Sequence, residues 1–214
     1  MYAQWKHYID PNIEVCPMEL PGRGRRINES LPASFDGAVD DLFGQICGDL
    51  AGKYGFFGHS LGTMMAWALH RKIRLLKLNG PAHLYVSGRG APHVPNHKRY
   101  SHLTDQEFSR KLVELGGTPQ AFFEYPELTQ IMLPVLKRDF ELSETDLSEQ
   151  EAIPFEGNLT VFQGKDDDLT DEQVGGWKKQ ATGMCTVHYF PGGHFFINDH
   201  FRDMIRIINR TMAT

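Results

Sequence analysis

The chain has 214 residues, 41% of them hydrophobic and 23% charged, which is enough for one sizeable globular domain with a real core. Its formal net charge of −5 does not favour a nucleic-acid surface, and no apolar run approaches the length of a membrane span. The N-terminus has no signal-peptide core. Three cysteines, without a Cys-x-x-Cys pair, favour a reducing cytoplasm, with the thiols as small core residues.

The first part of the chain alternates between predicted strands and predicted helices. Residues 13–18 are expected to form a strand, and apolar side chains at helical spacing predict an amphipathic helix over about 35–51. A short apolar run at 54–57 predicts a buried strand, an apolar helix follows it, and Leu84–Ser87 is the next expected strand. This alternation predicts an α/β fold with a mostly parallel sheet flanked by helices.

Only helices are predicted between about 93 and 150. Thr104 and Glu107 have the spacing of a capping box, and the helix that they open is expected to end at the glycine pair 116–117. The later helical stretches are rich in Phe, Leu and Met side chains. One interpretation is that these side chains pack on one another. The other is a helical lid whose inner face contacts an apolar substrate.

The sheet is expected to resume in the last part of the chain. Residues 159–162 predict a strand, and a helix is expected near 171–181, although two glycines within it weaken that helix. The last predicted strand covers 186–190, and a closing helix starts near 199.

Residues 58–62, Gly-His-Ser-Leu-Gly, have the G-x-S-x-G spacing of a nucleophile elbow. In such an elbow a strand turns sharply into a helix, so that the serine hydroxyl is exposed and flanking glycines allow close passage of the chain. A predicted strand precedes Ser60 and a predicted helix follows it, as this function requires. The alternative is a Gly-rich turn whose serine only caps the helix.

A serine nucleophile needs a base, and the base needs an orienting carboxylate. In the fold class that the elbow indicates, these residues follow in the order Ser, Asp or Glu, His, each after a strand. Asp167 follows the strand that runs to about Gly164, and His194 follows the one that ends at Phe190. The sequence therefore predicts a triad of Ser60, Asp167 and His194, with Asp166 as the alternative to Asp167.

Two other kinds of site are not favoured. The run Gly22-x-Gly24 has Ile27 where a phosphate-binding loop needs a third glycine. His93 and His97 are four residues apart, but the prolines around them disfavour a helix, and the aspartate run has no recognised metal-ligand spacing. We therefore expect neither a phosphate-binding loop nor a catalytic metal.

With the elbow at 58–62, the motifs Ser-Gly-Arg-x-Ala-Pro-His at 87–93 and Gly-Gly-His-Phe-Phe at 192–196 resemble those of the type II thioesterases that accompany nonribosomal peptide and polyketide synthetases. The Ser-Gly-Arg-x-Ala-Pro-His and Gly-Gly-His-Phe-Phe motifs separate that family from generic esterases. The resemblance covers essentially the whole chain. The matching stretches are Met18–Arg23, Phe57–Gly62, Val86–His93, Leu115–Pro119, Leu133–Phe140 and Pro191–Phe196.

The resemblance implies one α/β-hydrolase domain over residues 1–214, with a helical lid inserted at about 93–150. It implies a hydrolase of antibiotic biosynthesis that removes acyl groups from the phosphopantetheine of acyl or peptidyl carrier domains and so edits mis-primed synthetases. The resemblance also implies a monomer without a cofactor of its own, because the phosphopantetheine arrives with the substrate.

The resemblance also assigns site residues. The triad of the family falls on Ser60, Asp167 and His194, and the backbone N–H of Leu61 would be one donor of the oxyanion hole. Two alternatives to the carrier thioesterase stay open: a small-molecule carboxylesterase with the same triad, and a non-catalytic carrier-binding protein.

One departure from the family concerns the N-terminus. Family members usually begin with an apolar strand and a Pro-x-Ala-Gly-Gly-like loop that supplies the second oxyanion N–H, and this sequence begins after that point. We expect a truncated sequence whose missing strand would lie beside the elbow strand. Loss of one oxyanion donor typically lowers the rate about 10²- to 10³-fold, so we expect the chain as written to be unstable or poorly active.

Overall fold

The computed structural model describes residues 2–148 and 153–213. In these residues four parallel strands form one sheet, as the alternating pattern predicted. His59, Ser87 and Phe162 are in register at neighbouring positions, so the carboxyl ends of the first three strands lie at one edge of the sheet. In spatial order the strands are β1 (Gly55–His59), β2 (His83–Ser87), β3 (Asn158–Gly164) and β4 (Cys185–Phe190).

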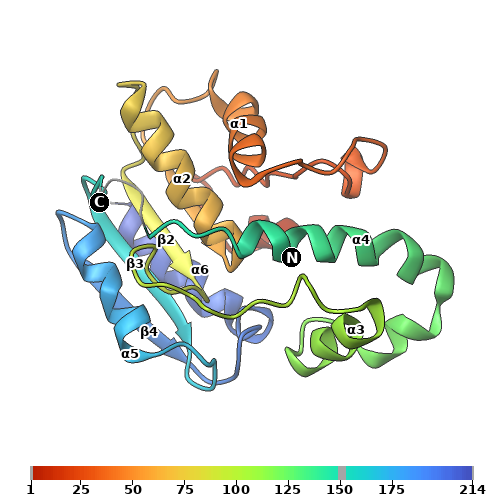
Figure 1. The fold of residues 1–214 in the computed structure, drawn as a ribbon. Helices are drawn as coiled ribbons and strands as arrows, with labels where there is room; N and C mark the ends of the chain where they lie inside the picture. The colour runs from red at the N-terminus through yellow and green to blue at the C-terminus, as the bar shows by residue number, and fades with distance from the viewer. Residues whose placement is uncertain (1, 149–152, 214) are drawn as a thin grey trace.

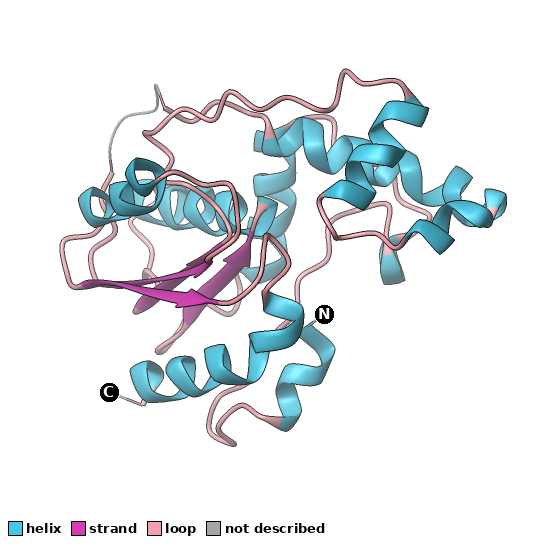
Figure 2. Cartoon of the chain, turned by 90° about the horizontal axis from the view of Figure 1, so that it is seen from below, coloured by secondary structure: helices cyan, strands magenta, loops and turns pink. Residues whose placement is uncertain are grey.

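Helices cover both faces of the sheet, because each face carries a separate cluster of buried apolar side chains (Figures 1 and 2). The two termini of the described chain lie on the same side of the sheet (Figure 2). One face packs against α1 (Phe35–Ile46), α2 (Leu61–Leu75), α5 (Asp171–Gly175) and the 3-10 helix η4 (Gly176–Gln180), and the other against η1 (Tyr2–His7) and α6 (Ile197–Met212).

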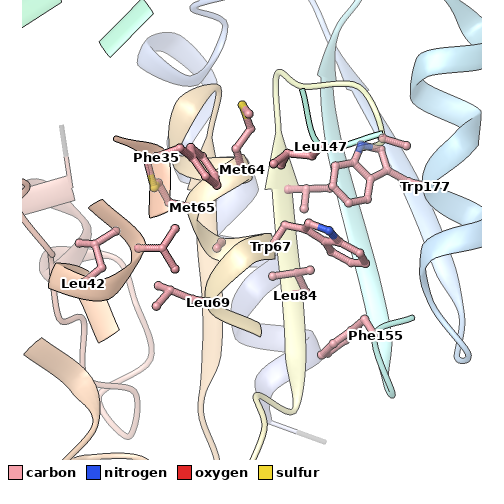
Figure 3. Close-up of a cluster of buried hydrophobic side chains, with 14 of the residues drawn as sticks. Phe35, Leu42, Met64, Met65, Trp67, Leu69, Leu84, Leu147, Phe155 and Trp177 are labelled. Atoms are coloured by element: carbon pink, nitrogen blue, oxygen red, sulfur yellow. The ribbon is translucent and has the colours of Figure 1, made fainter. Parts of the chain in front are cut away.

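The larger core cluster fixes α2 on the sheet (Figure 3). Trp67 on α2 is 3% exposed and meets the ring of Trp177 edge to face, with 5.7 Å between ring centroids. Leu84 on β2 lies beneath them and is fully buried. Burial of each such side chain stabilises the fold by about 1.5–3 kcal/mol. The helix that starts next to Ser60 is thus held firmly along its length.

Helical elements separate β2 from β3 and extend to one side of the sheet (Figure 1). The predicted capping box is present, with the Thr104 hydroxyl accepting from the Glu107 N–H. Phe108, Leu112 and Leu133 form the centre of a small apolar cluster, whereas Leu128 and Ile131 are exposed. The elements are α3 (Asp105–Glu114), the 3-10 helix η3 (Gln120–Glu124) and α4 (Pro126–Ser143), together called the insertion below.

Two expectations from the sequence are wrong. Residues 13–18 form no strand; they run as irregular chain in which Pro17 has no N–H to donate, and β1 is an edge of the described sheet. Two of the three thiols, Cys16 and Cys47, are exposed and not core residues. A short 3-10 helix, η2 (Gly24–Arg26), follows the irregular segment. No helix in the described ranges combines the length and the apolarity needed to cross a membrane.

Candidate active site

Ser60 lies in a strained turn between β1 and α2. Its backbone angles are φ 53° and ψ −116°, a region that side-chain-bearing residues rarely adopt and that costs about 1–3 kcal/mol. Gly58 must be glycine here, because a Cβ would lie 2.0 Å from the carbonyl oxygen of Gly62. The strand, sharp turn and helix expected of a nucleophile elbow are therefore all present.

Buried hydrogen bonds hold this turn against the end of β2. The Ser60 N–H donates to the carbonyl oxygen of Ser87 over 2.8 Å. The fully buried hydroxyl of Thr63 lies 2.8 Å from the Gly58 carbonyl oxygen and accepts from the Ser87 N–H over 3.0 Å. Sequence reasoning missed Thr63, because a threonine in a helix has no pattern that reveals a bond to a distant strand.

His194 and Asp167 form a hydrogen-bonded pair after β4 and β3. His194 Nδ1 lies 3.1 Å from Asp167 Oδ2, and the Asp167 side chain is only 5% exposed. Burial by itself raises the pKa of Asp167, but the hydrogen bond and the charge of His194, with a smaller contribution from Gln163, outweigh burial and leave this pKa below its usual value. The carboxylate is therefore ionised and able to orient the imidazole.

The three adjacent aspartates have three different partners. Asp167 contacts His194, whereas Asp166 braces the neighbouring turn: its carboxylate accepts from the Gly192 N–H over 3.1 Å. The Asp166 N–H also donates to the Gly192 carbonyl oxygen over 3.0 Å. Asp168 points elsewhere and pairs with Lys98. The structure thus brings Asp167, the first choice from the sequence, to His194, and gives Asp166 a role in joining the two loops.

The imidazole of His194 lies beside the elbow. Its ring centroid is 5.1 Å from that of His59, the residue before Ser60. Gly88, at the end of β2, passes close to both histidines, because a Cβ there would lie 2.6 Å from His59 Cε1 and 3.4 Å from His194 Cε1. Within the described residues the Ser60 hydroxyl makes no hydrogen bond to His194. Such catalytic hydrogen bonds often form only when substrate is bound.

Leu61 is the first residue of α2, so its N–H is one of those without a partner inside the helix. The N-terminus of this 15-residue helix carries a partial positive charge that favours a developing negative charge nearby. This is the position to which the family resemblance assigned one donor of the oxyanion hole.

The architecture and the site together define a class of protein. A parallel sheet between helices, with a serine elbow after one strand and an Asp–His pair after two later strands, is the α/β-hydrolase fold. The chain belongs to the thioesterase family, since the family model described as "Thioesterase domain" matches residues 1–212. It is a hydrolase that acts on thioesters, and the predicted resemblance to type II thioesterases is confirmed.

Known relatives match the chain over most of its length. Linear gramicidin dehydrogenase LgrE from Brevibacillus parabrevis is 33% identical over 219 residues, 100% of this chain and 83% of that protein. Gramicidin S biosynthesis protein GrsT from Aneurinibacillus migulanus is 33% identical over 209 residues, 97% of this chain and 81% of that protein. The crystal structure of ClbQ from the colibactin NRPS/PKS pathway has a TM-score of 0.92 and 33% identity, covering 99% of this chain and 90% of ClbQ.

Proposed function

We propose that this chain hydrolyses acyl groups from the phosphopantetheine thiol of carrier domains in nonribosomal peptide or polyketide synthesis. Ser60 is the nucleophile, His194 the general base and Asp167 the orienting carboxylate. The observation that carries this proposal is the buried Asp167–His194 pair next to a serine in a strained strand-to-helix turn. Carboxylate, imidazole and serine in these roles perform acyl transfer on several unrelated folds.

In the first half of the reaction the acyl group moves to the enzyme. The Ser60 oxygen attacks the thioester carbonyl carbon while His194 Nε2 takes the serine proton, because Nδ1 is bound to Asp167. The carbonyl oxygen becomes an oxyanion, which the Leu61 N–H and the α2 N-terminus stabilise. The oxyanion then re-forms the carbonyl as the carbon–sulfur bond breaks, and the phosphopantetheine sulfur takes the proton from His194 and leaves as the thiol.

In the second half water removes the acyl group from Ser60. His194 takes a proton from water, and the hydroxide attacks the ester carbonyl carbon. The carbon–oxygen bond to Ser60 breaks, and His194 returns the proton to the serine oxygen. The product is a free carboxylic acid, and the enzyme is restored without a cofactor. LgrE carries the name of a dehydrogenase, but the residues assembled here perform acyl transfer and not hydride transfer.

The position of the insertion next to the site is consistent with a substrate that carries a large acyl group. Gly117, just after α3, lies against the residue that follows His194, since a Cβ on Gly117 would be 2.2 Å from Phe195 Cζ. This contact supports the proposal that the insertion acts as a lid over the site. GrsT is named for gramicidin S biosynthesis and ClbQ comes from an NRPS/PKS pathway, which supports carrier domains as the partners.

Parallel assays test this function. Release of acid from an acyl-phosphopantetheinyl carrier protein is compared with hydrolysis of a simple p-nitrophenyl ester carrying the same acyl group. We expect a higher kcat/KM for the carrier substrate and loss of both activities in Ser60→Ala. A higher kcat/KM for the simple ester would indicate a carboxylesterase, and carrier binding without turnover would indicate a binding protein.

A further inference from the structure

His59 is a buried histidine beside the catalytic centre to which the reaction above assigns no step. His59 is 8% exposed, and the centroid of its ring lies 5.1 Å from that of the His194 ring, with an angle of 46° between the ring planes. His59 Nδ1 lies 2.9 Å from the hydroxyl oxygen of Ser87, which is itself fully buried. The ring is therefore held from one side and contacts the general base on the other.

The surroundings leave the His59 ring little freedom. The ring of Phe196 meets it edge to face at 5.8 Å, and that of Phe195 lies 6.1 Å away. Gly88, at φ 59°, leaves room for both histidines only because it has no Cβ. The contact with the His194 ring distinguishes His59 from the buried His70, whose ring packs against Trp67 and Phe155.

The ring of His59 is uncharged at neutral pH. Burial is the main cause that lowers its pKa to about 3, and the charge of His194 lowers it further. Asp167 and the backbone of His194 act in the opposite direction without reversing the result. An uncharged ring at this place does not repel the imidazolium that forms on His194 during the reaction.

We propose that His59 is a positioning residue for His194: anchored by Ser87, its ring supports the His194 imidazole and keeps Nε2 directed at Ser60. The single hydrogen bond to Asp167 fixes one ring atom of His194 and leaves the ring free to swing about that bond. Contact with the His59 ring removes part of this freedom. The inference rests on the proposed function, because it requires His194 to be the base for Ser60.

The first test removes and then restores the ring. With a carrier-bound or N-acetylcysteamine thioester, we expect His59→Ala to lower kcat about 10²-fold, the cost of a small displacement of a catalytic group, with KM changed less than about threefold. We expect His59→Phe to recover at least about tenfold of that loss, because a ring again supports His194. Equal kcat for His59→Ala and wild type would overturn the proposal.

A double-mutant cycle separates positioning from general damage. In a His194→Ala background, His59→Ala is expected to leave the residual rate unchanged within about twofold, because there is no imidazole left to position. An equal fold-loss in both backgrounds contradicts the proposal. If His59→Ala does not fold, Ser87→Ala is used in the same cycle, with an expected loss of about tenfold that disappears in His194→Ala.

His70 provides the matched control. It is a second buried, uncharged histidine, 1% exposed, with burial as the main cause that lowers its pKa to about 4, and it packs on α2 against Trp67 and Phe155. His70→Ala is expected to lower stability and to leave kcat within about twofold. If it lowers kcat as much as His59→Ala does, the proposal is wrong. Unchanged turnover in Ser60→Ala would instead overturn the proposed function itself.

Discussion

Gly88 lies beside the active site and leaves no room for a side chain between the two histidines. A methyl group there would lie 2.6 Å from His59 Cε1, and the backbone at φ 59° already disfavours any residue with a side chain. We expect Gly88→Ala to displace His59 and His194, to lower kcat at least about 10²-fold and to cost about 1–2 kcal/mol of stability. Steady-state kinetics and urea unfolding measure the two effects.

Gly44 provides the control for this substitution. It lies within α1, and a Cβ there would meet nothing within 4 Å. Gly44→Ala is expected to leave kcat unchanged and to stabilise the helix by up to about 1 kcal/mol. If Gly88→Ala keeps the kcat of the wild type, the expectation that a side chain at this position displaces His59 and His194 is wrong.

The aspartate run shows how far residue identity predicts a site. The position of the aspartates directly after a predicted strand was enough to make Asp167 the first choice and Asp166 the alternative. The orientation of each side chain depends on the Asp166–Gly192 bonds between two loops that are distant in sequence, so spacing alone could not decide between them. His59 and Thr63 lay outside the prediction for the same reason: their partners come from other strands.

At the scale of the element, the β1–α2 turn depends on the Thr63 hydroxyl. Thr63→Val keeps the side-chain shape and removes the hydroxyl that accepts from the buried Ser87 N–H and donates to the Gly58 carbonyl oxygen. We expect a loss of about 1–3 kcal/mol in urea unfolding, because these two buried hydrogen bonds are lost. Thr129→Val on α4, whose hydroxyl bonds to its own helix at Tyr125, should cost less than about 0.5 kcal/mol. Equal costs for the two variants would contradict this role.

An ion pair joins the insertion to the N-terminal part of the chain. Arg23 Nη1 lies 2.6 Å from Asp139 Oδ2 on α4, and both side chains are largely buried, at 22% and 23% exposure. Burial raises the pKa of Asp139, and Arg23 only partly opposes this. Removal of one partner of such a pair leaves a poorly solvated charge and is typically costlier than removal of both.

We therefore expect Arg23→Leu to cost about 1–3 kcal/mol in urea unfolding, since the pair keeps some contact with solvent. The double variant Arg23→Leu/Asp139→Leu should lose less than the sum of the two single variants. Strict additivity would show that the two side chains do not stabilise each other.

Among the elements, those with strong local signals were predicted correctly. The capping box before α3 and the apolar spacing of α1 gave helices close to the expected positions. The strand expected at 13–18 failed, because a strand also needs a neighbour to pair with, and residue pattern says nothing about that. The helix near 171–181 divides at its glycines into α5 and η4.

At the scale of the whole molecule, buried histidines link stability to pH. Burial is the main cause that lowers the pKa of His59 to about 3 and the pKa of His70 and His83 to about 4, from an ordinary value of 6.5. The unfolded chain therefore binds more protons than the folded chain below about pH 6.5, and stability falls as the pH drops toward 4. We expect about 1–2 kcal/mol of lost stability per histidine at pH 5.

Urea unfolding at pH 7 and pH 5 measures this loss. His70→Leu should show a smaller difference between the two pH values than the wild type, because it removes one of the groups that titrate. The prediction fails if stability is the same at both pH values, or if His70→Leu keeps the full difference.

The sequence predicted the order of strands and helices along the chain better than it predicted the contacts between distant segments. Alternation of strands and helices predicted the parallel sheet, and the long helical interval predicted the position of the insertion. The contact between Gly117 and Phe195, which brings the insertion to the site, joins residues far apart in the chain and has no local signature.

The most direct test of the account is the rate at which a fluorophosphonate labels Ser60. This reagent reacts with an activated serine, and mass spectrometry locates the label. We predict one label at Ser60, none in Ser60→Ala, and labelling slowed about 10⁴-fold in Asp167→Asn, because the imidazole loses its orienting carboxylate. Asp166→Asn, which keeps an oxygen for the Gly192 N–H, should stay within a few-fold of wild type. Equal labelling of Ser60→Ala, or a larger effect in Asp166→Asn than in Asp167→Asn, would contradict the account.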